Sequence, residues 1–222
     1  MPKKLWTTLF LSLSILAIGC SNSNLSNKTI LKSSLENSTI LSQNLTGISH
    51  QDNATVKETN LTTGTFLVGQ DIPTGRYIFT GDGTLSIWNG ETKVINEIID
   101  SSNKAGISSV TTDLFDGQKI EVTSLTNLKL TPSQTILKEL LSTGNWIVGR
   151  DIEPGNYICE PVSNKGLLEG KGNLLIYDDE ILLVDENMDA SGNDGVNYFT
   201  VELKEGQIIS VCNIPTLKFT KN

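Results

Sequence analysis

An internal repeat constrains the fold of this chain more than any other feature of its sequence. Residues 64–78 read GTFLVGQDIPTGRYI and residues 144–158 read GNWIVGRDIEPGNYI, at an offset of 80 positions. Farther along the chain the offset is 89, because 116–120 (DGQKI) matches 205–209 (EGQII). One insertion near residues 161–170 explains the change. Self-similarity at a fixed period indicates duplicated structural units, so we expect two copies of one unit.

Each copy carries the pattern of short β-strands. Residues 199–203 (FTVEL) alternate apolar and polar side chains, which is the period of a strand with one buried face. Glycine, asparagine and aspartate separate the apolar runs, as turns require. The strands expected in the first copy are 65–68, 76–80, 84–88, 93–99, 107–114, 118–123 and 127–131. This pattern predicts an all-β chain with two tandem small antiparallel sandwich or jelly-roll-like modules, 63–132 and 144–222.

The connection between the copies, residues 133–143, contains the helical candidate of the chain. The apolar residues of a helix over 133–141 would share one face: Ile136, Leu137, Leu140 and Leu141. We therefore expect a short linker there, with a helix as one option.

The motif shared by the two copies consists of residue types that build turns and cores. Its matched residues are Gly69, Asp71, Gly75 and Tyr77 in the first copy and Gly149, Asp151, Gly155 and Tyr157 in the second. Aspartates can accept hydrogen bonds from nearby backbone amides in a turn, and glycines can supply a positive φ. A tyrosine can pack its ring while its hydroxyl finds a partner. We therefore interpret the motif as structural.

The pattern G-x-[aromatic]-x-V-G-x-D-I-x-P-G-x-Y resembles a repeat found in many uncharacterised surface proteins and lipoproteins, mostly of Gram-positive bacteria. The resemblance covers both copies. It implies a β-rich extracytoplasmic module, and it carries no known activity with it.

The N-terminal segment predicts export and a lipid anchor. Lys3 and Lys4 precede an apolar run over 5–18, which suits a signal-peptide core but is too short to span a bilayer. The run ends in LAIGC at Cys20, which resembles a bacterial lipobox. The resemblance implies a signal peptide over 1–19 and a cysteine that is lipidated on sulfur, which would anchor the protein to the cell membrane on its extracytoplasmic side. The alternative is a cleaved, secreted protein.

The segment that follows, residues 20–62, reads as a polar tether. Between 21 and 62 the chain has 8 serines, 7 asparagines and 6 threonines in 42 residues, and no aromatic residue. Such a stretch buries too little apolar surface to offset its ordering entropy. His50, the one histidine, lies there, and general-base catalysis needs a fixed geometry that a tether does not give.

Composition argues against several classes of function. The formal net charge is −8, and it becomes −10 when Lys3 and Lys4 leave with the signal peptide (15 basic against 25 acidic residues). An acidic chain lacks the cationic surface that binds nucleic acid. Without a histidine in either copy, we expect no Ser–His or Cys–His catalysis, no zinc site and no cofactor. A carboxylate-based hydrolase is the less favoured alternative.

Two further groups of residues are weaker site candidates. Asp185, Asn187 and Asp189 place oxygens at alternate positions, as calcium requires, although a solvated acidic turn is the favoured interpretation and no metal is expected. Trp88 and Tyr177 occupy equivalent positions and can stack on sugar rings, with a core role as the favoured alternative.

The cysteines leave one question open. Once Cys20 is lipidated, Cys159 and Cys212 form an even pair outside the cytoplasm, so a disulfide is one option. Two free thiols are the other, because Cys212 falls opposite the inward positions Ile209 and Val211.

The function expected from the sequence is that of a lipid-anchored, non-enzymatic binding or interaction module. Its partners would be the membrane, through the anchor, and an unidentified envelope protein, peptide or glycan. A structural or accessory envelope lipoprotein without a ligand is the alternative.

Overall fold

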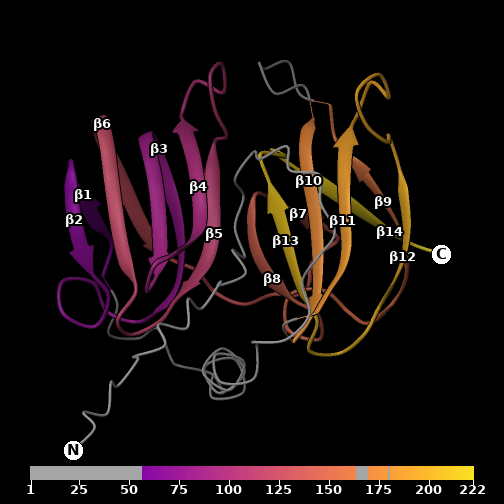
Figure 1. The fold of residues 1–222 in the computed structure, drawn as a ribbon, viewed down its shortest axis with the longest axis horizontal. Helices are drawn as coiled ribbons and strands as arrows, with labels where there is room; N and C mark the ends of the chain where they lie inside the picture. The colour runs from indigo at the N-terminus through magenta and orange to yellow at the C-terminus, as the bar shows by residue number, and fades with distance from the viewer. Residues whose placement is uncertain (1–56, 164–169, 180) are drawn as a thin grey trace, which may run out of the picture.

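A computed structural model of the chain describes residues 57–163, 170–179 and 181–222. The expected signal peptide, Cys20, His50 and most of the expected tether lie outside these described residues. All regular structure within them is β: fourteen strands and no helix (Figure 1). The all-β class expected from the sequence is confirmed. Among the described residues, no helix is long and apolar enough to cross a membrane.

The strands divide along the chain into an N-terminal and a C-terminal half. The N-terminal half contains β1 (Thr59–Leu61), β2 (Gly64–Leu67), β3 (Gly75–Asn89), β4 (Thr92–Asp100), β5 (Ser109–Leu114) and β6 (Lys119–Pro132). The C-terminal half contains β7 (Leu140–Leu141), β8 (Gly144–Ile147), β9 (Gly155–Pro161), β10 (Lys171–Asp178), β11 (Ile181–Asp189), β12 (Phe199–Leu203), β13 (Ile208–Cys212) and β14 (Leu217–Lys221).

These strands form two sheets. The larger has ten strands in the order β1-β6-β3-β5-β8-β13-β10-β11, with β2 also paired to β6 and β4 to β3. The smaller has the order β12-β9-β14-β7. The pairing of β5 with β8, at Thr111 and Gly144, is parallel and joins the two halves. Figure 1 shows the halves side by side, with β5 and β8 on the sides that face each other.

Each half has its own hydrophobic core. The N-terminal core extends from Leu61 to Leu130 and includes the buried rings of Tyr77 and Phe79. The C-terminal core extends from Leu141 to Phe219 and includes the buried ring of Trp146. Burial of apolar surface is the main driving force of folding, so each half carries its own main source of stability.

The strands expected in the first copy are present, with two mergers. The expected strands 76–80 and 84–88 are the two ends of β3, which bends at a register shift between Asp82 and Thr84. The expected strands 118–123 and 127–131 are likewise the two ends of β6. In the C-terminal half the matching positions form separate strands, β9 with β10 and β13 with β14. The insertion between β9 and β10 accounts for the first of these breaks.

The helical option for the linker is wrong. Residues 133–138 have no regular structure, and β7 follows, pairing with β14 and burying Leu141 in the second core. Ile136 and Leu140 remain 64% and 54% exposed while Leu141 is buried, so the apolar side chains of the linker do not form one buried face. The expected tether is similarly one strand too long, because β1 buries Leu61 by pairing with β6.

Candidate functional site

The shared motif builds the same turn in both halves. Oδ2 of Asp71 accepts the backbone N–H of Leu67, and Oδ2 of Asp151 accepts the backbone N–H of Ile147, each at 2.8 Å. In both halves the carboxylate thus fixes the turn between two strands, as a short acidic side chain can do for a nearby amide.

The motif glycines adopt the backbone conformation expected of them. Gly69 and Gly149 have φ of 92° and 90°, and Gly75 and Gly155 have φ of 146° and 153°. A Cβ at Gly69 would meet only the carboxylate end of the exposed Asp116 side chain, which can move aside, so this turn requires glycine for its φ.

The motif tyrosines are buried and internally bonded. The hydroxyl of Tyr77 donates to the carbonyl oxygen of Pro73, and that of Tyr157 donates to the carbonyl oxygen of Glu153, both at 2.9 Å. Burial raises the pKa of Tyr77 to about 12. Each hydroxyl therefore closes its own motif loop and is not directed toward a ligand.

The candidate calcium ligands do not converge. Asp185 and Asn187 are exposed on β11, whereas Asp189 is 1% exposed. Both carboxylate oxygens of Asp189 accept hydrogen bonds, from the backbone N–H and hydroxyl of Ser191 at 2.8 and 2.7 Å and from the backbone N–H of Asp194 at 2.9 Å. The bond from Asp194 leads the effects that hold the pKa of Asp189 well below its usual range. Among the described residues, no group of three or more acidic, histidine or cysteine side chains could hold a metal ion.

Asp100 has the same role in the N-terminal half. Its Oδ1 accepts the hydroxyl and backbone N–H of Ser102 at 2.6 and 2.8 Å, and its Oδ2 accepts the backbone N–H of Ala105 at 2.7 Å. The hydroxyl bond from Ser102 is the main reason why the pKa of Asp100 falls to about 2. Asp100 and Asp189 are therefore paired turn anchors, 89 positions apart.

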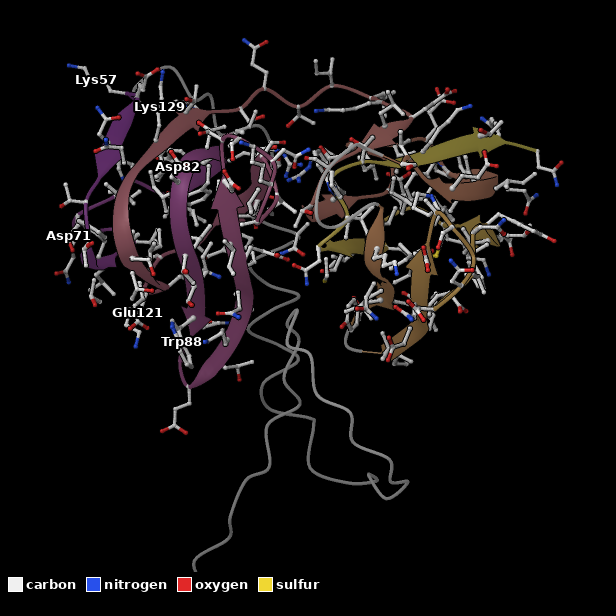
Figure 2. All side chains as sticks on the ribbon, turned by 90° about the horizontal axis from the view of Figure 1, so that it is seen from above. Lys57, Asp71, Asp82, Trp88, Glu121 and Lys129 are labelled. Atoms are coloured by element: carbon white, nitrogen blue, oxygen red, sulfur yellow. The ribbon has the colours of Figure 1, made fainter. Side chains whose placement is uncertain are left out.

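Neither candidate stacking residue presents an open ring. Tyr177 is 5% exposed, and burial raises its pKa to about 12. Trp88 is half-buried, with the Nζ atoms of Lys93 and Lys119 at 4.7 and 4.8 Å from its ring centroid. Its indole N–H donates to Oε2 of Glu121 at 3.2 Å, and both side chains lie near the same end of the half (Figure 2). The structure gives no support to sugar stacking at either ring.

The optional disulfide between Cys159 and Cys212 is not formed. Cys159 is a buried free thiol on β9 of the smaller sheet, while Cys212 lies on β13 of the larger one. Burial raises the pKa of Cys159 to about 12, which makes it an inert core residue.

A charged cluster between the two halves was not foreseen from the sequence. Nη1 of Arg76 lies 2.8 Å from Oδ2 of Asp113, and its Nη2 lies 3.1 Å from Oδ1 of Asp151. Nη2 of Arg150 contacts the same two carboxylates at 2.7 and 2.9 Å. We call Arg76, Asp113, Arg150 and Asp151 the junction cluster. Its two cations and two anions balance, as burial of charge requires.

The sequence did contain a signal for this cluster. Arg76 is matched by Asn156 in the second copy, and Arg150 is matched by Gln70 in the first. Each arginine therefore stands at a position where the otherwise similar copies differ, and its counterpart in the other copy is a neutral amide. Arg76 also lies over the ring of Trp146, 4.9 Å from its centroid.

A lone carboxyl is buried at the same junction. Glu97 on β4 is 1% exposed, and its Oε1 accepts the backbone N–H of Asn213 at 3.2 Å. Its Oε2 has no hydrogen-bond partner within the described part of the chain. Burial raises the pKa of Glu97 to about 8, and no charged neighbour among the described residues contributes to the shift.

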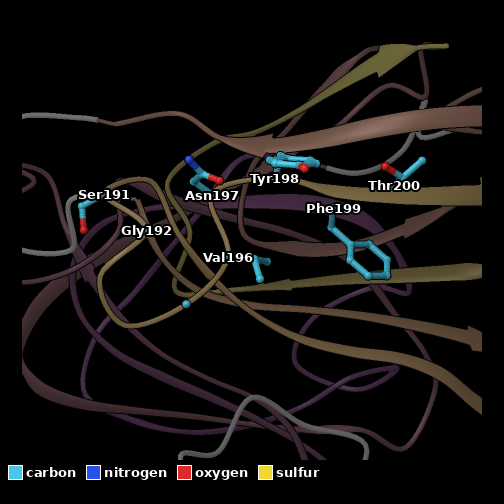
Figure 3. A pocket seen from close by; sticks show the side chains of 8 residues that line it. Ser191, Gly192, Val196, Asn197, Tyr198, Phe199 and Thr200 are labelled. Carbon is cyan, nitrogen blue, oxygen red and sulfur yellow. The ribbon is translucent and has the colours of Figure 1, made fainter.

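The surface of the C-terminal half carries the other notable features. Ile181, Leu182 and Leu183 at the start of β11 are 66%, 40% and 52% exposed, and Tyr198 is 60% exposed. An open hollow of about 510 Å³ is lined by residues between 191 and 200, from the β11–β12 loop and β12 (Figure 3).

None of the buried groups with a raised pKa lines this hollow. No protein-family model matches the chain, and no curated protein matches it either. Its function is therefore inferred from its own residues and their geometry.

Proposed function

We propose that this chain is a lipid-anchored extracytoplasmic protein whose two tandem antiparallel β-sandwich modules act as a non-enzymatic interaction module of the cell envelope. The observation that carries the proposal is the internal use of the shared motif. Its carboxylates and tyrosine hydroxyls all bond within their own turns, and Asp151 in addition joins the junction cluster. What the two copies have in common therefore builds a scaffold, and recognition falls to surfaces on which they differ.

Recurrent hydrogen bonds support two modules of common design. The backbone N–H of Val68 donates to the carbonyl of Gln118, and that of Val148 to the carbonyl of Gln207, each at 2.9 Å. These pairs are related by the offsets of 80 and 89 found in the sequence. The two separate cores, one on each side of the junction, support the same division.

Three features favour interaction over catalysis. The hollow is lined by glycine, hydroxyl, amide and hydrophobic side chains, with no carboxylate pair among its described residues. Tyr77, Glu97 and Cys159 owe their raised pKa values to burial, and no charged group in the described part of the chain contributes to these shifts. Asp100 and Asp189, the acids with lowered pKa values, are occupied as turn anchors. The purified protein should therefore not turn over generic peptide, ester or glycoside substrates. Turnover that survives repurification would instead support the carboxylate hydrolase.

The anchor is tested through Cys20. Wild-type cells labelled with palmitate should yield a labelled protein in the membrane fraction, and Cys20→Ser should remove both the label and the membrane association. A Cys20→Ser protein that still sediments with membranes would contradict the anchor.

The interaction role is tested by cross-linking in intact cells. Photoreactive side chains replacing Ile98, Leu183 or Tyr198, all exposed, sample three surfaces of the described residues. We expect a discrete cross-linked product with another envelope component from at least one position. An absence of products from all three would favour the structural or accessory lipoprotein.

A further inference from the structure

Three consecutive large apolar side chains are exposed at the start of β11. Ile181, Leu182 and Leu183 remain 66%, 40% and 52% exposed, and they follow Asp178 at the end of β10 and Asp179 in the turn. Consecutive exposed apolar residues have no folding benefit and are typical of contact surfaces.

The N-terminal half shows that this apolar run is not needed for the fold. At the matching positions, 89 residues earlier, it has Thr92, Lys93 and Val94 at the start of β4. Those three residues form the same hairpin with β3, including a register shift at the equivalent place. The exposed run is therefore a specific addition to the C-terminal half.

The run lies on the edge strand of the larger sheet. β11 ends the ten-stranded sheet and pairs only with β10 among the described strands. At the other end of β11, Val196 bonds to the outer side of the strand. Its N–H donates to the carbonyl of Asn187, and its carbonyl accepts the N–H of Asp189. Because backbone groups alternate along a strand, Asp185 directs its N–H and C=O to the same outer side. Unpaired edge groups next to exposed apolar side chains form a template for a short added strand.

The charge at this edge selects the partner. Asp178, Asp179 and Asp185 are exposed there. Lys171 of β10 lies opposite Asp189 at the other end of β11 and is engaged by Asp194 at 2.8 Å. Residues 142–222 as a whole carry 6 basic and 13 acidic residues. A second copy or an anionic lipid surface would meet like charge, whereas a basic segment would meet opposite charge.

We propose that the β11 edge binds an extended segment of another envelope protein that carries both apolar and basic side chains. The segment would add to the sheet by main-chain hydrogen bonds, and Ile181–Leu183 would receive its apolar side chains. This inference rests on the proposed interaction role, for which it names the surface and the chemistry of the partner.

The test replaces the three residues at the start of β11 by the residue types found at the matching positions of β4. The purified full-length protein and its triple variant Ile181→Thr, Leu182→Lys, Leu183→Val are titrated with a labelled seven-residue peptide of alternating lysine and valine. A peptide of alternating glutamate and valine is the charge control. We expect the lysine peptide to bind wild type at least tenfold more tightly than it binds the variant, and more tightly than the glutamate peptide binds wild type. The two proteins should melt at similar temperatures, because β4 folds with these residues.

Each other outcome counts against the proposal. Equal binding to both proteins, no binding, or preference for the glutamate peptide would overturn it. Concentration-dependent self-association, or binding to vesicles of anionic phospholipid, that is lost in the triple variant would replace the partner with a second copy or a membrane. Cross-links in cells from positions 98 or 198 but not from 183 would overturn the β11 inference and leave the interaction role standing.

Discussion

The buried carboxyl of Glu97 provides a quantitative test of how the two halves meet. It is 1% exposed, it accepts a hydrogen bond from the backbone of Asn213 in the other half, and its Oε2 has no partner among the described residues. Burial raises its pKa from an ordinary 4.5 to about 8. The folded protein thus keeps the carboxyl of Glu97 protonated over a pH range in which the same group is ionised in the unfolded chain.

The direction in which stability changes with pH follows from proton binding. Between pH 4.5 and pH 8 the folded state binds more protons at Glu97 than the unfolded state, so the stability contributed by the protonated group decreases as the pH rises. The slope approaches roughly 1.4 kcal/mol per pH unit, or about 4–5 kcal/mol across the window. Below pH 4.5 both states are protonated and above pH 8 both are ionised, so the slope vanishes at each end.

Glu97→Gln removes the titration while keeping the shape of the protonated side chain. Urea unfolding at pH 5, 6, 7 and 8 should give free energies of unfolding that differ little between wild type and variant at pH 5. The variant should be the more stable by a few kcal/mol at pH 8. Glu186→Gln, at the matching position in the C-terminal half and half-buried, is the control and should show no such divergence. Parallel pH profiles for wild type and Glu97→Gln would refute a buried carboxyl at the junction.

Other residues offer further tests of the same arrangement. A Cβ at Gly144, whose φ is 138°, would clash with the backbone of β5, so Gly144→Ala should lower the melting temperature by more than about 5 °C. Gly64→Ala, whose added Cβ meets only a neighbouring ring at 3.6 Å, should lower it by much less, and equal effects would contradict the close approach of the halves. Arg76→Met should cost roughly 3–5 kcal/mol in urea unfolding, because it leaves buried carboxylates short of one cation, and a loss below about 1 kcal/mol would argue against their burial. Tyr77→Phe and Tyr157→Phe should each cost about 1 kcal/mol, since each removes one hydrogen bond of 2.9 Å, and a much larger loss in one alone would show that the two motifs are not equivalent.

Local chemistry explains what could be predicted from the sequence. Turn glycines and period-two alternation depend on neighbouring residues, so most strands of the N-terminal half begin and end within a few residues of their expected positions. Asp71 and Gly69 are predictable as turn residues for the same reason. The merger into β3 was not predictable, because Gly81 and Gly83 look like turn residues and here serve a bend within one strand.

Contacts between distant strands explain what could not be predicted. Asp185 and Asp189 look alike in the sequence, but only Asp189 lies where a loop wraps its carboxylate in N–H donors. The surroundings of Trp88 depend on Lys119, which a different strand brings across the sheet. The residue pattern along one strand does not show which residues of other strands lie beside it. A comparison of the two copies does indicate such neighbours, as it does for the junction cluster.

The comparison of the two copies also explains why the contact at the junction cluster forms between the two halves of one chain and does not continue between chains. Each residue of the junction cluster has a counterpart in the other copy, on the side of that half away from the junction. In the order Arg76, Asp113, Arg150 and Asp151, these counterparts are Asn156, Glu202, Gln70 and Asp71. Both arginines are replaced by neutral amides there, while both acidic positions stay acidic. The same contact between two copies of the chain would bring Glu202 toward Asp71 with no cation between them, and burial of unpaired charge is strongly unfavourable. The charges that hold the two halves together thus also oppose extension of the contact into a head-to-tail chain, which an interface between unlike surfaces would otherwise permit.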